Sequence, residues 1–261
     1  MRDRDRHVRL LQQLRADGHT TVADLSEAFG VTPSTIRRDL QQLARDGRLV
    51  RTYGGATVGG AGAASRIDPM LAAKRRIAAA AAALVADGST IAIGSGTTAL
   101  EFARAIADRR LTVITNAMDV ATALLDRPGI ELIVLGGVVR PVMHSMLGHL
   151  AELAARELRA DTFFMGIGAI SLEQGLMNDY VPEILTDRAL HRMARSVVVL
   201  ADSTKFDEVA PGFLFGLDEV DAIVTDDAVD SRILDALRRR GITVHVAADD
   251  DAAADRRGDA A

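Results

Sequence analysis

The stretch Thr32-Pro33-Ser34-Thr35-Ile36-Arg37-Arg38-Asp39-Leu40 predicts a helix that begins at a polar residue and carries two adjacent arginines. Thr32 can accept hydrogen bonds from the first N–H groups of this helix, and Pro33 stands where a missing N–H costs nothing. One apolar stripe at helical spacing is formed by Ile36, Leu40 and Leu43. The opposite face and its flanks carry Ser34, Thr35, Arg37, Arg38, Gln41, Gln42 and Arg45.

The segments around this helix predict a winged helix-turn-helix. Two amphipathic helices precede it, over residues 4–16 and 22–29, and Gly30 separates the second from the third. A basic ribbon with a glycine turn follows, Arg51-Thr52-Tyr53-Gly54-Gly55. Three amphipathic helices with an ordinary solvated face are the alternative, but the order of the elements favours a protein that binds double-stranded DNA.

Hydroxyl, guanidinium and amide groups are the side chains that hydrogen-bond base edges and phosphates in a major groove. From their places on the third helix and the ribbon, we expect the DNA-binding residues to be Thr32, Pro33, Ser34, Thr35, Arg37, Arg38, Gln41, Arg51, Tyr53 and Gly54.

Composition limits the remaining possibilities. The chain of 261 residues has no cysteine, so it has no disulfide framework. Its apolar stretches are too short to span a bilayer, and we expect a cytoplasmic protein with no membrane partner. The net charge is −5, yet residues 1–52 hold ten arginines against seven acidic residues. Because residues 1–52 are basic and the rest of the chain is acidic, we expect only this N-terminal head to bind DNA. Because the positive surplus is small, we expect several heads to act together in a homo-oligomer.

The chain divides into a DNA-binding domain over residues 1–58, a glycine-rich linker over 59–68, a second domain over 69–247 and a disordered tail over 248–261. Short apolar runs alternate with helical patterns in the second domain. We therefore expect an α/β fold with a mainly parallel sheet covered on both faces. The expected strands lie at 90–93, 111–114, 131–135, 162–165, 196–200, 222–224 and 242–246, and the expected helices at 69–86, 97–107, 118–125, 146–158, 182–195 and 231–239.

Three small-residue turns follow expected strands, where open α/β sheets bind ligands. They are Gly94-Ser95-Gly96-Thr97-Thr98, Thr115-Asn116 and Gly136-Gly137, the last with Arg140 close behind. Backbone N–H groups at a helix start form an anion site. Each turn taken alone is better explained as a tight strand-to-helix connection, but the three together favour a phosphate-bearing ligand. The first is not a P-loop, because no Gly-Lys-Ser/Thr follows it.

Lysine is rare in this chain, since Lys74 and Lys205 are its only lysines among 31 basic residues. Lys205 follows a strand and could reach a ligand phosphate, with Asp202 as its counter-charge, although it could also be a plain surface residue. Lys74 is expected on a solvated helix face. Carboxylates that could hold sugar hydroxyls are Asp161, Asp179, Glu183 and Asp226, and Asp161 could instead be a helix-to-strand connector. The histidines have no metal-ligand spacing, so we expect no metal and no cofactor.

The quoted residues resemble the DeoR-type family of bacterial sugar-responsive transcriptional regulators over nearly the whole chain. The head matches through Val22-Ala23-Asp24-Leu25-Ser26, residues 31–40, Gly47 and residues 51–56, although the family usually has His where Tyr53 stands here. The body matches through Gly96-Thr97-Thr98, Thr115-Asn116, Gly136-Gly137, residues 161–166, residues 201–205 and Thr225-Asp226.

This resemblance implies a second domain similar to ribose-5-phosphate isomerase, and a homo-oligomer whose grip on operator DNA is changed by a phosphorylated sugar. The expected function is a repressor of a carbohydrate operon, not an enzyme. The expected effector-binding residues are Gly94, Ser95, Gly96, Thr97, Thr98, Asn116, Gly136, Gly137, Arg140, Asp161, Glu183, Asp202 and Lys205. A sugar-phosphate isomerase or deaminase with an added DNA-binding head is the alternative, and an architectural DNA-binding protein is a third.

Overall fold

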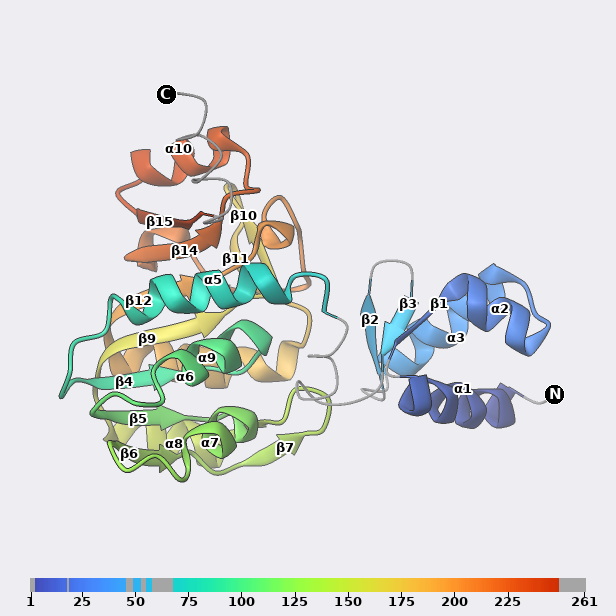
Figure 1. Cartoon of the computed structure of the whole chain (residues 1–261), viewed down its shortest axis with the longest axis horizontal. Helices are drawn as coiled ribbons and strands as arrows, with labels where there is room; N and C mark the ends of the chain where they lie inside the picture. Colours follow the sequence, from blue (N-terminus) through green and yellow to red (C-terminus); the bar gives the residue numbers. More distant parts are fainter. Residues whose placement is uncertain (1–2, 18, 46–48, 53–54, 58–67, 249–261) are drawn as a thin grey trace, which may run out of the picture. The chain divides into compact units, whose positions relative to one another are not determined.

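A computed structural model describes residues 3–17, 19–45, 49–52, 55–57 and 68–248. The chain divides into two compact units: the first contains residues 1–69 and 140–144, and the second contains residues 70–139 and 145–261. Figure 1 shows the helices and strands of both units. Among the described residues, no helix is both long and apolar enough to cross a bilayer.

The first unit is a small helical domain with a three-stranded antiparallel sheet in the order β1-β3-β2. Its elements are α1 (Asp3–Asp17), β1 (His19–Thr21), α2 (Val22–Phe29), α3 (Pro33–Arg45), β2 (Val50–Thr52) and β3 (Gly55–Thr57). The predicted stripe of α3 lies in the core, where Ile36, Leu40 and Leu43 pack with Leu10, Leu14 and Leu25. This hydrophobic contact sets which face of α3 points outward.

The second unit is built on a seven-stranded parallel sheet in the order β15-β14-β12-β9-β4-β5-β6. The strands are β4 (Thr90–Ile93), β5 (Leu111–Thr115), β6 (Ile130–Val134), β9 (Ala160–Gly166), β12 (Ala194–Leu200), β14 (Ala222–Asp226) and β15 (Thr243–Ala247). All seven lie where the alternating pattern predicts them, and the expected mainly parallel α/β fold is confirmed.

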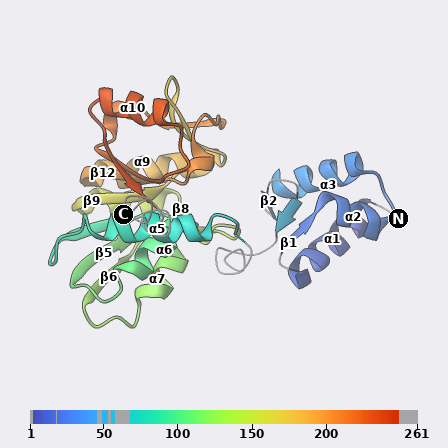
Figure 2. The same ribbon diagram turned by 45° about the horizontal axis from the view of Figure 1, so that its top comes forward.

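Helices cover both faces of this sheet. Successive side chains of each buried strand point to opposite faces, so each strand contributes to both hydrophobic layers. In β9, Phe164 packs with α5 (Leu71–Ala82), α6 (Thr97–Ala105) and α7 (Met118–Leu124) on one face. Phe163 and Met165 face the other layer, formed by α8 (His149–Glu157), α9 (Ile184–Met193) and α10 (Ser231–Arg239). Figure 1 shows α5, α6 and α7 in front of the sheet with α8 and α9 behind it, and Figure 2 gives the tilted view.

Two smaller sheets were not predicted. One is the antiparallel sheet of β10 (Ala169–Ser171), β11 (Gly175–Asn178) and β13 (Gly212–Phe215), and the other pairs β7 (Val138–Arg140) with β8 (Ser145–Leu147). The predicted helix from Met146 begins only at His149, because residues 145–147 form β8. Short 3₁₀ turns lie at η1 (Val181–Glu183), η2 (Ser203–Lys205) and η3 (Leu217–Glu219).

The strand order reverses between β4 and β9. From β4 the chain proceeds to β5 and β6 on one side, and from β9 it proceeds to β12, β14 and β15 on the other. Such a reversal leaves a crevice at the carboxyl ends of the two central strands, since the helices that follow them lie on opposite faces. In this protein these carboxyl ends lie at Gly94, directly after β4, and at Gly166, the last residue of β9.

Candidate functional site

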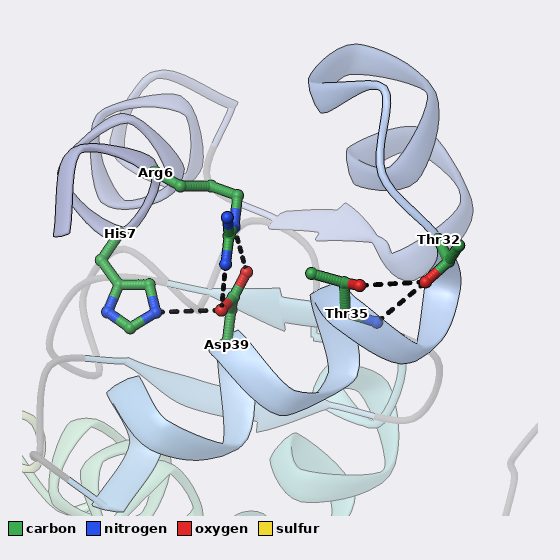
Figure 3. Close-up of polar contacts among 5 residues, drawn as sticks. All are labelled: Arg6, His7, Thr32, Thr35 and Asp39. Carbon is green, nitrogen blue, oxygen red and sulfur yellow. Dashed lines mark hydrogen bonds and ion pairs between the residues drawn. The ribbon is translucent and has the colours of Figure 1, made fainter. Parts of the chain in front are cut away.

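Helix α3 begins as the sequence predicts. The hydroxyl of Thr32 accepts a hydrogen bond from the Thr35 N–H at 3.3 Å, and its carbonyl accepts from the same N–H at 3.0 Å. Thr32 Oγ1 also lies 2.8 Å from the Ser34 hydroxyl. It lies 3.0 Å from the Thr35 hydroxyl (Figure 3). These hydroxyl groups hold one another in place at the start of the helix, where residues of helix-turn-helix proteins meet base edges.

The outward face of α3 carries the predicted polar residues. Residues Thr32, Pro33, Ser34, Arg37, Arg38 and Gln41 are exposed, and Thr35 is half-buried. The preceding helix α2 ends at Gly30, whose left-handed φ of 63° turns the chain into α3. Of the other predicted DNA-binding residues, Arg51 lies in β2, whereas Tyr53 and Gly54 lie outside the described residues.

One acidic residue of α3 faces inward and ties the helix to α1. Asp39 is buried, and its carboxylate accepts hydrogen bonds from Arg6 Nε at 2.5 Å and Arg6 Nη2 at 2.9 Å. His7 Nε2 lies 3.1 Å from Asp39 Oδ1 (Figure 3). Burial alone would raise the pKa of Asp39, but the hydrogen bonds from Arg6 and His7 outweigh it and hold the pKa below its ordinary value of 3.8. Asp39 therefore stays ionised and sets the orientation of α3.

The second unit has its candidate site in the crevice between β4 and β9. The Gly94 N–H donates to the Phe164 carbonyl at 3.0 Å, which holds the 94–98 loop against β9. Gly166 faces that loop so closely that a Cβ would lie 3.2 Å from the Ser95 carbonyl oxygen. The side chain of Ser95 also forms a hydrogen bond: its hydroxyl donates to Glu183 Oε1 at 3.2 Å. The structure thus brings Ser95 and Glu183 together, as predicted.

The loop leads directly into α6, and its geometry suits an anion. Gly96 precedes the first residue of α6 with φ of 121°, a conformation that favours glycine, and provides no side-chain cap for the helix N–H groups. Ser95, Gly96 and Thr97 are half-buried, so a ligand can reach them. The positive end of the helix dipole and the N–H groups of its first turn therefore point toward an accessible crevice.

Asn116 lies beside this loop. Ile93 and Thr115 are paired across β4 and β5, and the Thr115 hydroxyl donates to the Ile93 carbonyl at 2.7 Å, so the next residues, Gly94 and Asn116, are neighbours. The Asn116 amide donates through Nδ2 to the Met146 carbonyl at 3.1 Å. Its Oδ1 is buried and has no hydrogen-bond partner among the described residues.

A tight turn after β12 carries the predicted Asp202 and Lys205. The Ser203 N–H donates to Asp226 Oδ2 at 2.8 Å, and the Thr204 N–H donates to Asp202 Oδ1 at 3.1 Å. Lys205 follows at the end of η2, half-buried, and no acidic side chain in the described ranges pairs with it. The prediction that Asp202 is the counter-charge of Lys205 is wrong. Asp202 pairs with Lys74, whose Nζ lies 3.8 Å from Asp202 Oδ2. Lys74 is buried, so its predicted solvated position is also wrong.

Other predicted effector residues lie elsewhere. Asp161 stands near the start of β9, and its Oδ2 accepts from the N–H of Thr90, the first residue of β4, at 3.0 Å. It therefore lies at the opposite edge of the sheet from the 94–98 loop. The prediction that Asp161 lines the site is wrong, and the alternative of a helix-to-strand connector describes it correctly.

Gly137 also has a simpler explanation than ligand binding. A Cβ on Gly137, whose φ is 147°, would lie 2.6 Å from the Leu147 carbonyl oxygen, so glycine allows the chain to pass β8 closely. Arg140 ends β7, outside the seven-stranded sheet. We do not include Gly136, Gly137 and Arg140 in the site.

The first turn of α9 supports the crevice through residues that sequence reasoning missed. The Thr186 hydroxyl accepts from the Gly148 N–H at 3.0 Å. Asp187 Oδ2 accepts from Asn178 Nδ2 at 3.0 Å, and Asn178 Oδ1 accepts from the Gly168 N–H at 2.8 Å. No sequence signal marks these positions, because their partners Gly148, Gly168 and Asn178 lie in other elements or in the turns between them and meet α9 only in the folded domain.

The two units together define a helix-turn-helix protein with an α/β ligand-binding domain. Family models match both parts: the DeoR-like helix-turn-helix domain over residues 6–59 and the DeoR C-terminal sensor domain over residues 70–227. The chain belongs to the DeoR family, and the predicted resemblance is confirmed.

Its curated relatives are transcriptional repressors. The repressor CsqR of Escherichia coli strain K12 is 32% identical, with 88% of this chain and 92% of the relative covered. The repressor AccR of Agrobacterium fabrum strain C58 is 32% identical, with 85% and 89% covered. The glycerol-3-phosphate regulon repressor of Escherichia coli strain K12 is 29% identical, with 87% and 92% covered.

Solved structures include partial matches to the second unit. Ribose 5-phosphate isomerase A of Methanocaldococcus jannaschii is 20% identical with a TM-score of 0.38, over 51% of this chain and 53% of that chain. The eIF2B beta subunit of Chaetomium thermophilum is 20% identical with a TM-score of 0.44, over 62% and 53%.

Replacing Arg37 or Arg38 by alanine is expected to weaken binding to a cognate operator by about 1–3 kcal/mol where a base contact is lost. Both arginines are exposed on the outward face of α3. Gel shifts at several salt concentrations separate the two contact types, since a lost phosphate contact lowers the salt slope by about one and weakens all sequences alike. Arg9→Ala, an exposed arginine of α1, is the charge-matched control. Unchanged affinity in both α3 variants would contradict the assignment of α3 as the DNA-reading helix.

Proposed function

We propose that this protein is a repressor of a carbohydrate operon whose hold on its operator is changed by a phosphorylated sugar bound in the β4–β9 crevice. The observation that carries the proposal is the accessible 94–98 loop at the start of α6, placed at the reversal of strand order. Anionic groups bind at such helix starts, and ligands of open α/β sheets lie at such reversals.

The polar groups around the loop suit the two ends of a sugar phosphate. Lys205 and the N–H groups of α6 suit the phosphate, because an ammonium and oriented N–H groups both form charge-assisted hydrogen bonds with it. Asn116 and Glu183 suit hydroxyl groups. One relative is named as the repressor of the glycerol-3-phosphate regulon, which fits a phosphorylated effector.

A regulator is favoured over a sugar-phosphate isomerase or deaminase. The relatives named as repressors align over 85% or more of this chain, so the likeness includes the DNA-binding head as well as the sensor. We infer that the ligand is bound and not converted, and that the protein works in the cytoplasm where its DNA lies. We also infer a homo-oligomer, because the small positive surplus of one head favours several heads binding together.

A melting screen of the full chain tests the proposed ligand class. At about 100 times its Kd, a ligand stabilises the protein by about 2.7 kcal/mol, a shift of the melting temperature of roughly 5–11 °C for a domain of this size. We expect at least one sugar phosphate to raise the melting temperature and to change the gel shift of a DNA fragment selected from the genome with the full chain. The same sugars without phosphate are the matched controls, and NMR of the ligand checks that it is unchanged. Equal shifts with free and phosphorylated sugars would contradict the proposal.

A further inference from the structure

The outer side of α8 and α9 carries large apolar side chains that face solvent. Leu150 of α8 is 67% exposed and Leu185 of α9 is 60% exposed, and Leu153 of α8 is exposed one helical turn after Leu150. Val181, in the turn before α9, and Phe213, in the strand β13 that packs against α9, are also exposed. We call these five residues the α8–α9 surface. Single exposed apolar residues are ordinary, but such a group on neighbouring elements marks an interaction site.

Helices α8 and α9 pack against each other behind the sheet and run in the same direction (Figure 1). At their starts, the N–H of Gly148, the N-cap of α8, donates at 3.0 Å to the hydroxyl of Thr186 in the first turn of α9. At their ends, the chain enters β9 and β12, whose first residues Ala160 and Ala194 are paired in register. The two helices are therefore aligned at both ends.

Each helix carries a leucine near its start and an exposed charge near its end. Leu150 and Glu157 are seven residues apart in α8, so they lie on one helix face. Leu185 and Arg192 have the same spacing in α9. Because the helices are aligned, the two opposite charges lie at the same level of the sheet. Both are exposed, and neither side chain pairs with another charge among the residues that the structure describes.

The arginine between Leu185 and Phe213 is already bound within its own unit. Arg188 donates through Nε to the Leu214 carbonyl at 2.7 Å and through Nη2 to the Phe213 carbonyl at 2.9 Å. Its guanidinium carbon lies 5.8 Å from the centre of the Phe213 ring. Arg188 therefore covers part of the ring and does not present a free guanidinium inside the apolar part of the surface.

We propose that the α8–α9 surface binds the same surface of a second copy of this chain, with α8 against the partner's α9. A two-fold axis parallel to the helices produces this arrangement and keeps the paired helices in the same direction. The leucines near the helix starts then meet one another, and Glu157 meets Arg192 of the partner subunit. Symmetry repeats this ion pair, so both charges of each copy are matched, which a partner of one charge sign would not achieve. The inference rests on the homo-oligomer of the proposed function and names its interface.

Sedimentation equilibrium of the full chain at several concentrations tests the surface. Leu185→Glu places a carboxylate in the apolar part, and symmetry makes the interface lose the contact twice. We expect the dissociation constant of the oligomer to rise at least about tenfold. The circular dichroism spectrum should not change, because Leu185 is exposed in the single chain. Leu125→Glu alters an exposed leucine after α7, on the opposite face of the sheet, and is the matched control. If Leu185→Glu assembled like Leu125→Glu, the proposal would be wrong.

A charge exchange tests how α8 and α9 meet. Glu157→Arg and Arg192→Glu each place like charges opposite one another, and each should raise the dissociation constant by at least about threefold. The double variant Glu157→Arg/Arg192→Glu restores opposite charges and should return toward the value of wild type. A double variant that assembles more weakly than both single variants would overturn the pairing of α8 with the partner's α9.

The same measurements separate this inference from the proposed function. A wild type that stays monomeric at every concentration would contradict both the homo-oligomer and this interface. An oligomer that persists in Leu185→Glu would contradict only the interface. The proposed ligand is tested independently by the melting screen.

Discussion

Replacing Arg6 by methionine is expected to destabilise the DNA-binding head by about 3–5 kcal/mol, the usual effect of removing one partner of a buried ion pair. Arg6 and Asp39 are both buried, and two hydrogen bonds of 2.5 and 2.9 Å join them (Figure 3). Without Arg6, the Asp39 carboxylate stays in the core with His7 as its remaining partner at 3.1 Å. Hydrogen exchange of the full chain, followed on peptides of α3, measures the loss locally.

Two further variants make this result specific. Arg9→Met changes an exposed arginine of the same helix and should alter stability by less than about 0.5 kcal/mol. Arg6→Met/Asp39→Leu removes both charges, and because apolar groups of similar volume can replace a buried pair, it should recover most of the stability. If Arg6→Met exchanged no faster than Arg9→Met, the pair would not hold α3 in place.

The pair also gives the head a defined response to acid. The pKa of Asp39 is lowered in the folded head, since hydrogen bonds from Arg6 and His7 overcome the effect of burial. A lowered carboxyl pKa contributes stability that is present above the unfolded pKa of about 3.9 and is lost as the pH falls through the folded pKa. The protection factors of α3 amides in wild type, which correct for the pH dependence of intrinsic exchange, should therefore fall below about pH 4. Arg6→Met/Asp39→Leu should lack this part of the acid response.

Local patterns predicted most of the fold because the relevant contacts are periodic. The stripe Ile36, Leu40 and Leu43 determines the outward face of α3, and continuous apolar runs mark strands that are buried on both faces. The strands β8 and β10 are only three residues long, too short to show a period. The pattern around Met146 therefore predicts a helix, although Met146 lies in β8 and its N–H donates to the Asn116 carbonyl at 2.7 Å.

The site was harder to predict because its residues meet through tertiary contacts. The 94–98 loop and Lys205 each follow a strand of the parallel sheet, so the sequence already places both at its carboxyl edge. Asp161 also adjoins a strand, but it precedes the apolar run and therefore lies at the opposite edge. Lys74 sits in a run with Arg75 and Arg76 that looks solvated, and only the packing of α5 reveals its burial beside Asp202.

Lys205→Ala is expected to abolish the response to the sugar phosphate while leaving operator binding intact. The acidic residues of the chain outnumber its basic ones, 36 to 31, so net charge cannot attract an anionic ligand and local groups must hold it. Lys205 is half-buried at the end of η2, in the turn that follows β12, and forms no ion pair with any residue that the structure describes, so we expect its charge to be available to a phosphate. The stabilisation of about 2.7 kcal/mol that the ligand gives wild type at about 100 times its Kd should therefore disappear.

The prediction has two parts, the loss of the ligand response and unchanged operator binding, and each part is measured separately. Melting of the full chain with and without the active sugar phosphate reports the sensor, and gel shifts without ligand report the head. Arg110→Ala, which removes an equal charge at the opposite edge of the sheet, should keep the full melting shift. Lys205 lies in the second unit and α3 in the first, so the variant should bind the operator like wild type in the absence of ligand. A normal melting shift in Lys205→Ala would contradict the role of Lys205 in binding the phosphate.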